Sequence, residues 1–399
     1  MRLRTHAGFR LFWTASTVSG FGSQVTTLAI EILIVTTLAG SAADVGLVKS
    51  ARWLPYLLVG IVVGALADRV RRKPLLVSTD LSRAVLLCAV PLLAWSGELT
   101  IGLLAALMSV FGLLSLVNDA AHQSFLPRLL PRESLTRANA RLEQSSAAAE
   151  TSGPAAAGGL VTWLGAPAAV LVDAGSYVVS GLLTARVVVT DPPPPTRGPL
   201  WQEIREGLAW VYGHRMLRPL SLITHGWTLF YAVLSAVYVP YGIRELHFSS
   251  LGLGLTLACG GVGGLLGSGL SERLGRRPGR VIPGAWLLDA AGIAVLAVTP
   301  AGGLLIAGVG QFLNGFGLGL SSPLELSYRQ AITPDRLQAR MNATMRSLNR
   351  TAVVIGAPLG GLLADSAGFR LALWVAAGGV ALAAIGLLAS PFRTARTEF

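Results

Sequence analysis

Long apolar runs recur along the whole chain, and they constrain its fold more than any other feature. Each run is about 20 residues long, enough for a helix to cross a hydrocarbon core of about 30 Å. Lipid offers the backbone no hydrogen-bond partner, so spans are helices or closed barrels, and these runs are too long and uniform for barrel strands. We predict twelve spans, at residues 11–38, 45–67, 75–96, 99–124, 142–164, 167–189, 217–243, 248–270, 281–299, 302–327, 343–364 and 369–391.

The composition agrees with a membrane protein and excludes three other classes. Of the 399 residues, 52% are apolar and only 13% are charged, and the mean hydropathy is +0.61. Such values exclude a disordered chain, a disulfide-rich secreted scaffold and an ordinary soluble enzyme. The sequence also has no Walker loop, metal-type cysteine and histidine cluster or nucleophile elbow, so we expect no enzyme activity, no metal and no cofactor.

The positions of the basic residues predict the orientation of the chain. Most of the 32 lysine and arginine residues lie in the N-terminal segment, the tail, the central gap and the gaps after spans 2, 4, 8 and 10. The opposite side has only Arg244 and Arg370. This asymmetry predicts a multi-pass protein of a bacterial-type inner (plasma) membrane with both termini in the cytoplasm. It also explains the net charge of +12 through the anionic bilayer, without nucleic acid.

Two segments of similar sequence predict an internal duplication. Residues Leu66–Pro74 follow span 2, and the similar residues Leu270–Pro278 follow span 8. Six spans in each half, both entering from the same side, indicate a parallel repeat with the substrate path between the halves. We predict an N-terminal half over 1–190, a cytoplasmic linker with an amphipathic helix over 191–216, and a C-terminal half over 217–399.

The loop after span 2 resembles the signature loop of the major facilitator superfamily. It reads Gly64-Ala-Leu-Ala-Asp68-Arg69-Val-Arg-Arg72-Lys73, against the superfamily pattern G-x-L-A-D-R-x-G-R-K. One departure is Arg71, where the general pattern has glycine. Other segments, such as Ala51–Pro55, resemble the drug and siderophore exporters of that superfamily, which include the enterobactin exporter and macrolide- and tetracycline-type efflux pumps.

This resemblance implies the fold and the mode of action. It implies an all-α membrane protein with twelve transmembrane helices in two six-helix halves, alternating access, and export driven by a proton gradient. The expected substrate is a small lipophilic drug, natural product or siderophore, and the expected partners are that substrate and the lipid bilayer, with the chain acting as a monomer. An uptake transporter of the same fold is the first alternative, and a membrane-embedded enzyme or receptor is the second.

Charged residues near the signature loop are candidates for a conformational gate. By resemblance, Asp68 caps or pairs with the neighbouring half and holds the outward-open state. The alternative is that Arg69, Arg72 and Lys73 only anchor the topology. Asp80 and Arg83 are three residues apart in span 3, so they share a helix face and form a second layer of the gate or a locally neutralised pair. The full set of gate candidates is Gly64, Asp68, Arg69, Arg72, Lys73, Asp80 and Arg83.

Ionisable residues inside the spans are candidates for proton or substrate binding, because burying a charge in lipid is costly. Glu31 in span 1 and Arg52 in span 2 are both predicted about 12 Å deep, either as a proton or cation site or as a fixed ion pair. Asp119 and His122 could relay a proton or could simply pack. Asp289 lies in span 9, and Glu325 is expected to pair with Arg329 in span 10.

Two further groups of residues have both a functional and a packing interpretation. Gly153, Pro154, Gly158 and Gly159 in span 5 resemble the antiporter motif of drug exporters, G-P-x-x-G-G, with one extra residue. Small residues also let helices approach closely. Trp227, Phe230 and Tyr231 in span 7 could stack on a flat ligand or serve packing and the interfacial aromatic belt.

Overall fold

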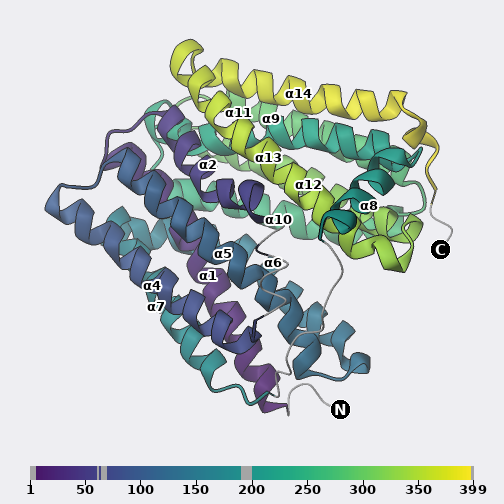
Figure 1. Cartoon of the computed structure of the whole chain (residues 1–399). Coiled ribbons are helices and arrows are strands. Elements are labelled where there is room, and N and C mark those ends of the chain that lie inside the picture. Colours follow the sequence, from purple (N-terminus) through teal and green to yellow (C-terminus); the bar gives the residue numbers. More distant parts are fainter. Residues whose placement is uncertain (1–5, 61–62, 64–69, 190–199, 397–399) are drawn as a thin grey trace. The chain divides into compact units, whose positions relative to one another are not determined.

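The computed structural model describes residues 6–60, 63, 70–189 and 200–396. Every regular element in these residues is helical (Figure 1). The helices are α1 (Ala7–Thr36), α2 (Ala42–Leu58), α4 (Arg72–Ser96), α5 (Ile101–Leu129), α6 (Arg132–Leu164), α7 (Ala166–Ala185), α8 (Leu200–Gly213), α9 (Leu217–Arg244), α10 (Ser250–Leu274), α11 (Pro278–Val298), α12 (Leu304–Ile332), α13 (Asp335–Ala367), α14 (Phe369–Ala389) and the short 3-10 helix η2 (Pro391–Thr394).

Eleven of the twelve predicted spans fall on helices of the described chain, and the described part of span 2, residues 45–60 and 63, begins on a helix. Nine of those described helices are long and apolar enough to cross a membrane: α1, α4, α5, α7, α9, α10, α11, α12 and α14. The other three spans fall on α2, which is described to Leu58, and on α6 and α13. These last two are 33-residue helices that begin with a charged stretch and continue into a small-residue, apolar one. The all-helical membrane fold is therefore confirmed.

Helix ends follow local capping chemistry. Thr100 accepts a hydrogen bond from the Leu103 amide at the start of α5, and Ser249 accepts one from the Gly252 amide at the start of α10. Such caps satisfy backbone donors that have no partner within the helix. After α4 the chain turns at Gly97, whose φ of 77° lies in the left-handed region that glycine adopts without strain.

The chain forms two compact units, which we call unit 1 (Met1–Ala39 and Ala51–Arg197) and unit 2 (Gly40–Ser50 and Gly198–Phe399). In unit 1, α7 packs against both α1 and α4, and α1 also packs against α6 (Figure 1). Aromatic and aliphatic side chains from several of these helices form its core around Phe12, Phe125 and Leu129.

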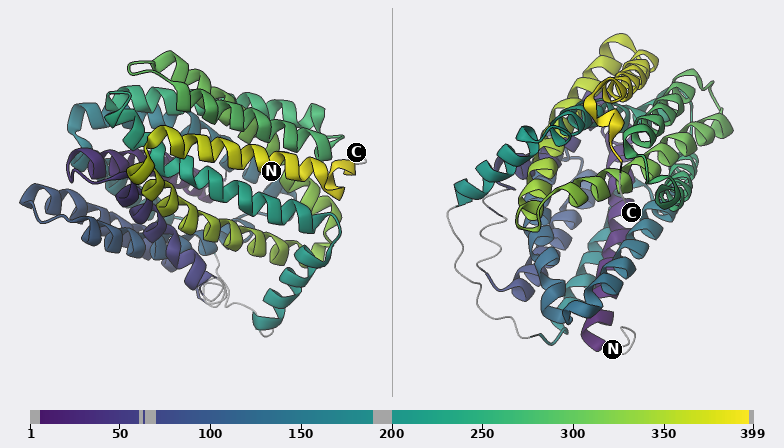
Figure 2. Two further views of the ribbon diagram at one scale, coloured as in Figure 1. Left: turned by 90° about the horizontal axis from the view of Figure 1, so that it is seen from above. Right: turned by 90° about the vertical axis from the view of Figure 1, so that its right-hand side faces the viewer.

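Glycines set the helix packing of unit 2, where α12 packs against both α10 and α11. The Gly315 Cα faces the backbone carbonyl of Gly260 so closely that a side chain there would overlap it, and Gly319 faces Gly264 in the same way. Gly260 and Gly264 therefore form part of the face of α10 that packs on α12. The yellow α14 completes this unit beside α9 and α11 (Figure 2).

Residues Gly40–Ser50 group with unit 2, although the rest of α2 groups with unit 1. Both carboxylate oxygens of Asp365 in α13 accept hydrogen bonds from the first turn of α2, from the Ala42 amide at 3.1 Å and the Ala43 amide at 2.9 Å. The Ser50 hydroxyl donates to the Val354 carbonyl at 2.8 Å, and Arg244 donates to the Gly40 carbonyl at 2.6 Å. Backbone and side-chain contacts thus both fix this segment on α9 and α13.

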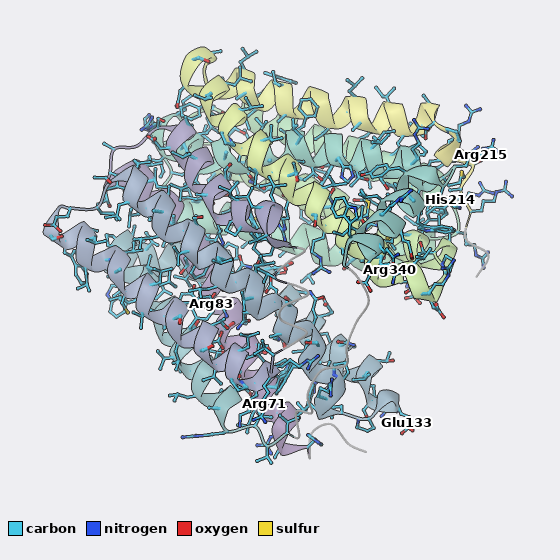
Figure 3. All side chains as sticks on the ribbon, viewed as in Figure 1. Arg71, Arg83, Glu133, His214, Arg215 and Arg340 are labelled. Atoms are coloured by element: carbon cyan, nitrogen blue, oxygen red, sulfur yellow. The ribbon has the colours of Figure 1, made fainter. Side chains whose placement is uncertain are left out.

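The helix α8 lies within the predicted linker. Its Val211 is buried against Met341 and Met345 of α13, while Glu203 and Glu206 form ion pairs with Arg340 of the same helix. Figure 3 shows Arg340 beside this helix. Trp201, Ile204 and Leu208 line an apolar pocket and lie, with Val211, on one side of α8, as expected for an amphipathic helix.

Candidate functional site

A buried ion pair lies at the centre of unit 1. Asp80 and Arg83 of α4 form a salt bridge, and neither side chain is more than 8% exposed. The second carboxylate oxygen of Asp80 accepts from the Ser180 hydroxyl of α7 at 2.7 Å, and the first also accepts from the Asn118 amide of α5 at 3.1 Å. The Arg83 guanidinium lies 4.1 Å from the ring centre of Tyr177. The predicted shared face is observed, and the pair joins α4, α5 and α7.

A polar cavity of about 300 Å³ lies next to this ion pair inside unit 1. Figure 3 shows Arg83 among the helices of this unit. Both members of the ion pair line the cavity, together with hydroxyl groups of α1, α6 and α7. The other polar lining residues are Ser16, Thr17, Ser19, Ser23, Asn118, Asp119, His122, Glu143, Ser145, Ser146, Tyr177, Ser180 and Thr184.

Asp119 and His122 both line this cavity, but each is held by a different partner. The Tyr56 hydroxyl donates to Asp119 Oδ2 at 2.7 Å. His122 Nε2 lies 2.9 Å from the Ser16 hydroxyl, and its ring is 4.6 Å from that of Phe12. The arrangement places two ionisable groups on one polar cavity, and the proton relay stays a prediction.

The predicted gate lies partly outside the described residues. Gly64, Asp68 and Arg69 are outside them, so the role of Asp68 stays a prediction. The side chain of Arg72 is buried, and its Nε donates to the Ser124 hydroxyl of α5 at 3.2 Å. Lys73 is half-buried at the start of α4.

Glu31 is buried in α1. Because a charge is costly to bury within a membrane span, an ionisable residue there is a candidate for function. Arg52 of α2 donates to the Thr27 hydroxyl at 3.4 Å, and its guanidinium lies 5.1 Å from the ring centre of Phe111. Thr27 lies one helical turn before Glu31, so Arg52 reaches the part of α1 where Glu31 stands. A functional link between Glu31 and Arg52 stays a prediction.

Unit 2 contains a second buried carboxylate, Asp289 of α11, which is 0% exposed. Asp289 Oδ2 accepts from the Trp227 indole of α9 at 3.0 Å, and Oδ1 accepts from the Asn314 amide of α12. Within the part of unit 2 that the structure describes, no salt bridge reaches this carboxylate. Asp289 is therefore held by two neutral donors.

The predicted aromatic residues separate into two roles. Trp227 stacks on Tyr231 at 5.0 Å and on Trp286 at 5.8 Å between ring centres, so three rings lie together beside Asp289. Phe230 instead packs on Gly379 of α14, where a side chain would overlap its ring, and it serves helix packing. Sequence reasoning missed Trp286, although its place three residues before Asp289 in one span could have suggested it.

Glu325 and Arg329 of α12, the predicted pair, form no contact ion pair in the described residues. Glu325 instead accepts from the Thr224 hydroxyl of α9 at 3.4 Å. The charge of Arg329 still acts on Glu325, so the two residues interact without a contact ion pair. Glu325 is directed toward α9.

The antiporter-like motif contributes a close helix contact. Gly153 in α6 faces Gln24 of α1 at a distance that leaves no room for a Cβ, whereas a Cβ at Gly159 would meet nothing within 4 Å. Pro154 lies inside α6, and Gly158 lies one turn after it in the same helix. Packing therefore explains Gly153, and an exporter-specific role of the motif stays a prediction.

Ionisable groups in the described residues form no cluster of three or more histidine, cysteine, aspartate or glutamate residues suited to a metal ion. The unit 1 cavity is lined by carboxyl, imidazole, guanidinium and hydroxyl groups, of which the carboxyl and imidazole groups can take up and release protons. Tyr177, Tyr56 and Ser180 were also missed from the sequence, since hydroxyl groups in spans give no distinct pattern.

Comparison with known proteins shows the family of the chain. Residues 3–398 match the model of the family described as transmembrane secretion effector. The multidrug efflux pump Tap of Mycolicibacterium fortuitum is 28% identical over 367 residues, which cover 89% of each chain. Macrolide efflux protein A of Streptococcus pyogenes is 22% identical over 372 residues, which cover 90% of each chain.

Solved structures show the same fold. A bacterial homologue of the iron transporter ferroportin, in an inward-facing state, matches 99% of this chain with a TM-score of 0.75 and 17% identity, and the match covers 100% of that chain. The nucleoside transporter NupG matches 98% of this chain with a TM-score of 0.73 and 12% identity, and the match covers 99% of that chain. With the family match and the efflux relatives, these likenesses show that the chain belongs to the transmembrane secretion effector family, in the drug-exporter branch of the major facilitator superfamily of membrane transporters.

Proposed function

We propose that this transporter exports small lipophilic compounds, such as drugs or natural products, in exchange for protons and by alternating access. Relatives named as multidrug and macrolide efflux proteins, matched over about nine-tenths of both chains, support the direction and the class of substrate. The proposed location is an inner membrane with both termini in the cytoplasm.

A comparison of the two units carries the proton part of the proposal. In unit 1, Asp80 of α4 accepts a hydrogen bond from Asn118 of α5. In unit 2, Asp289 of α11 accepts one from Asn314 of α12. These helices hold the third and fourth spans of each predicted half, so the same buried Asp–Asn contact occurs twice.

The two carboxylates differ in their counter-ions. Asp80 has Arg83 as its counter-ion. Asp289 has the neutral Trp227 indole as its second donor. An ionised carboxylate at 0% exposure without a cation is costly, whereas a bound proton removes the charge. Asp289 is therefore our primary candidate for the proton-coupling group.

The stacked rings beside Asp289 suit a lipophilic substrate. Trp227 connects the two features, because it donates to the carboxylate and stacks with Tyr231 and Trp286. A planar or apolar compound that contacts these rings would weaken the hydrogen bond from the Trp227 indole to Asp289. The affinity of Asp289 for a proton would change as a result. This arrangement offers a direct physical link between substrate and proton.

Everted membrane vesicles that contain the protein provide the test. A pH gradient is established and followed with a pH-sensitive dye while macrolides and other lipophilic drugs are added. We expect at least one drug to dissipate the gradient only in vesicles with wild-type protein, and Asp289→Asn to abolish this response. Full drug-dependent dissipation by Asp289→Asn would exclude Asp289 as the coupling group. A response to polar nutrients alone would indicate the uptake alternative.

A further inference from the structure

Asp173 is a second fully buried carboxyl group, and it lies in unit 1 between α7 and α1. Its exposed fraction is 0%, and in the described residues no ion pair within 4 Å reaches it. The charged groups whose fields reach it are Arg52 of α2 and Arg83 of α4, and Tyr177 is the ionisable neighbour on its own helix. The side of α1 that faces it presents Gly22 and Thr26, which have no charge.

Hydrogen-bond counting indicates which protonation state Asp173 adopts here. The Ser176 hydroxyl oxygen lies 2.8 Å from the Asp173 backbone carbonyl and also 2.8 Å from Asp173 Oδ1. A serine hydroxyl has one proton, and a carbonyl oxygen can only accept. If Asp173 were ionised, two acceptors would compete for that proton. If Oδ1 carries a proton, it donates to Ser176, Ser176 donates to the carbonyl, and both short contacts are satisfied.

The second carboxyl oxygen supports the same assignment. Asp173 Oδ2 is buried and has no hydrogen-bond partner within the described chain. The Thr26 hydroxyl lies against the carboxyl group without a hydrogen bond of good geometry, and its oxygen is likewise without one in the residues described. An ionised carboxylate requires several donors, and leaving a buried one without them is costly. A neutral carboxylic acid tolerates a bare carbonyl oxygen far better.

The packing of α1 against α7 depends on this neutral state. Gly22 of α1 faces Ser176 and Asp173 Oδ1 so closely that a Cβ would overlap both. Because the two helices touch at the carboxyl group itself, a change in its charge acts directly on the contact between α1 and α7. Loss of the proton is thereby coupled to helix packing inside unit 1.

The polar cavity of unit 1 provides a route to this carboxyl group. Ser23 and Tyr177 both line the cavity, and their hydroxyl oxygens lie 2.9 Å apart. Ser23 is the residue after Gly22, and Tyr177 lies one helical turn after Asp173, on the same face of α7. Cavity water can therefore reach a pair of hydroxyl groups whose residues are next to Gly22 on α1 and one turn from Asp173 on α7.

From these contacts we infer that Asp173 is a second proton-binding site of the transport cycle, which is protonated in this structure and exchanges its proton with the unit 1 cavity. The step is the binding or release of one H⁺ at a carboxylate oxygen, and no other bond changes. The inference rests on the proposed proton antiport. It adds a proton-binding site in unit 1 to the proposed site at Asp289 in unit 2.

Infrared spectroscopy of the purified protein tests the protonation state without transport. At neutral pH we expect a carboxylic-acid C=O band that Asp173→Asn removes. Asp289→Asn serves as the control that assigns any band of the other buried acid. Ser176→Ala removes the hydrogen-bond acceptor of the Asp173 proton and is expected to shift the band rather than abolish it. This variant gives a reading even if Asp173→Asn does not fold. A spectrum unchanged by both Asp173→Asn and Ser176→Ala would overturn the inference.

Proteoliposomes test the coupling, with radiolabelled erythromycin as the probe. Each exchanged proton supports about tenfold accumulation per imposed pH unit, since one unit corresponds to about 1.4 kcal/mol. We expect Asp173→Asn to lower the accumulation limit by one such factor per pH unit while macrolide exchange at equal pH continues. An unchanged limit would overturn the coupling role. Absence of gradient-driven accumulation in the wild type would instead count against the proposed antiport, and the infrared result would still report on Asp173.

Discussion

The buried ion pair of unit 1 allows a quantitative test through Arg83→Gln, Asp80→Asn and the double variant. Arg83→Gln leaves the Asp80 carboxylate with the Ser180 hydroxyl and the Asn118 amide as its neutral donors. Removal of one partner from a buried pair costs about 3–5 kcal/mol. Because about 1.4 kcal/mol corresponds to a factor of ten, the folding equilibrium constant should fall by roughly two to three and a half orders of magnitude.

The other two variants should cost less. Asp80→Asn leaves the Arg83 guanidinium over the Tyr177 ring, 4.1 Å from its centre. A desolvated contact of this kind contributes about 2 kcal/mol, so this variant should be the milder single change. The double variant removes both charges and replaces them with amides that can still form hydrogen bonds. It should cost far less than the sum of the single changes, which identifies direct coupling.

The assay is unfolding of the detergent-solubilised protein by increasing fractions of sodium dodecyl sulfate, followed by tryptophan fluorescence. Glu245→Gln is the matched control, because it removes the more exposed ion pair with Arg370, whose nitrogen and oxygen lie 3.3 Å apart. Such surface pairs contribute about 0.2–1 kcal/mol. Strictly additive effects of Asp80→Asn and Arg83→Gln would refute the argument, and so would an Arg83→Gln effect as small as that of the control.

Two further variants test helix packing and the Asp289 site. Gly315→Ala places a methyl group on the Gly260 carbonyl and should lower the unfolding free energy by about 1–3 kcal/mol, whereas Gly269→Ala, where nothing lies within 4 Å, should leave it unchanged or raise it in the same detergent titration. Trp227→Phe keeps a ring for stacking but removes the donor to Asp289, so drug-dependent dissipation of the pH gradient should shift to higher external pH. A pH profile identical to that of the wild type would show that the indole donor has no influence on proton binding.

Sequence reasoning was strong where lipid imposes a simple rule. A run of about 20 apolar residues has to become a helix, and α5, α11 and α14 follow directly from that requirement. The Asp80–Arg83 pair was equally accessible, since residues three apart share a helix face. Local spacing sufficed for these predictions because the partners lie on one element.

Contacts between helices that lie far apart in the sequence were not accessible. Glu325 has Arg329 at suitable spacing and still points to Thr224, more than one hundred residues away. Trp286 and Tyr177 acquire their neighbours only when α9 meets α11 and α7 meets α4. Spacing within one helix limits which residues can meet, but the rotation of each helix about its axis decides which of them do.

Residues Gly40–Ser50 have a consequence for dividing the chain in the laboratory. The central linker is the natural place to divide the chain, so that each half is expressed as a separate polypeptide. A first polypeptide ending at the linker would contain the beginning of α2, while Asp365, Val354 and Arg244, which hold that beginning, would be on the second. Each fragment would therefore lack contacts that the other provides. Co-expression should restore a stable protein that neither fragment forms alone. Residues Gly40–Ser50 of the first fragment would then pack on the second fragment.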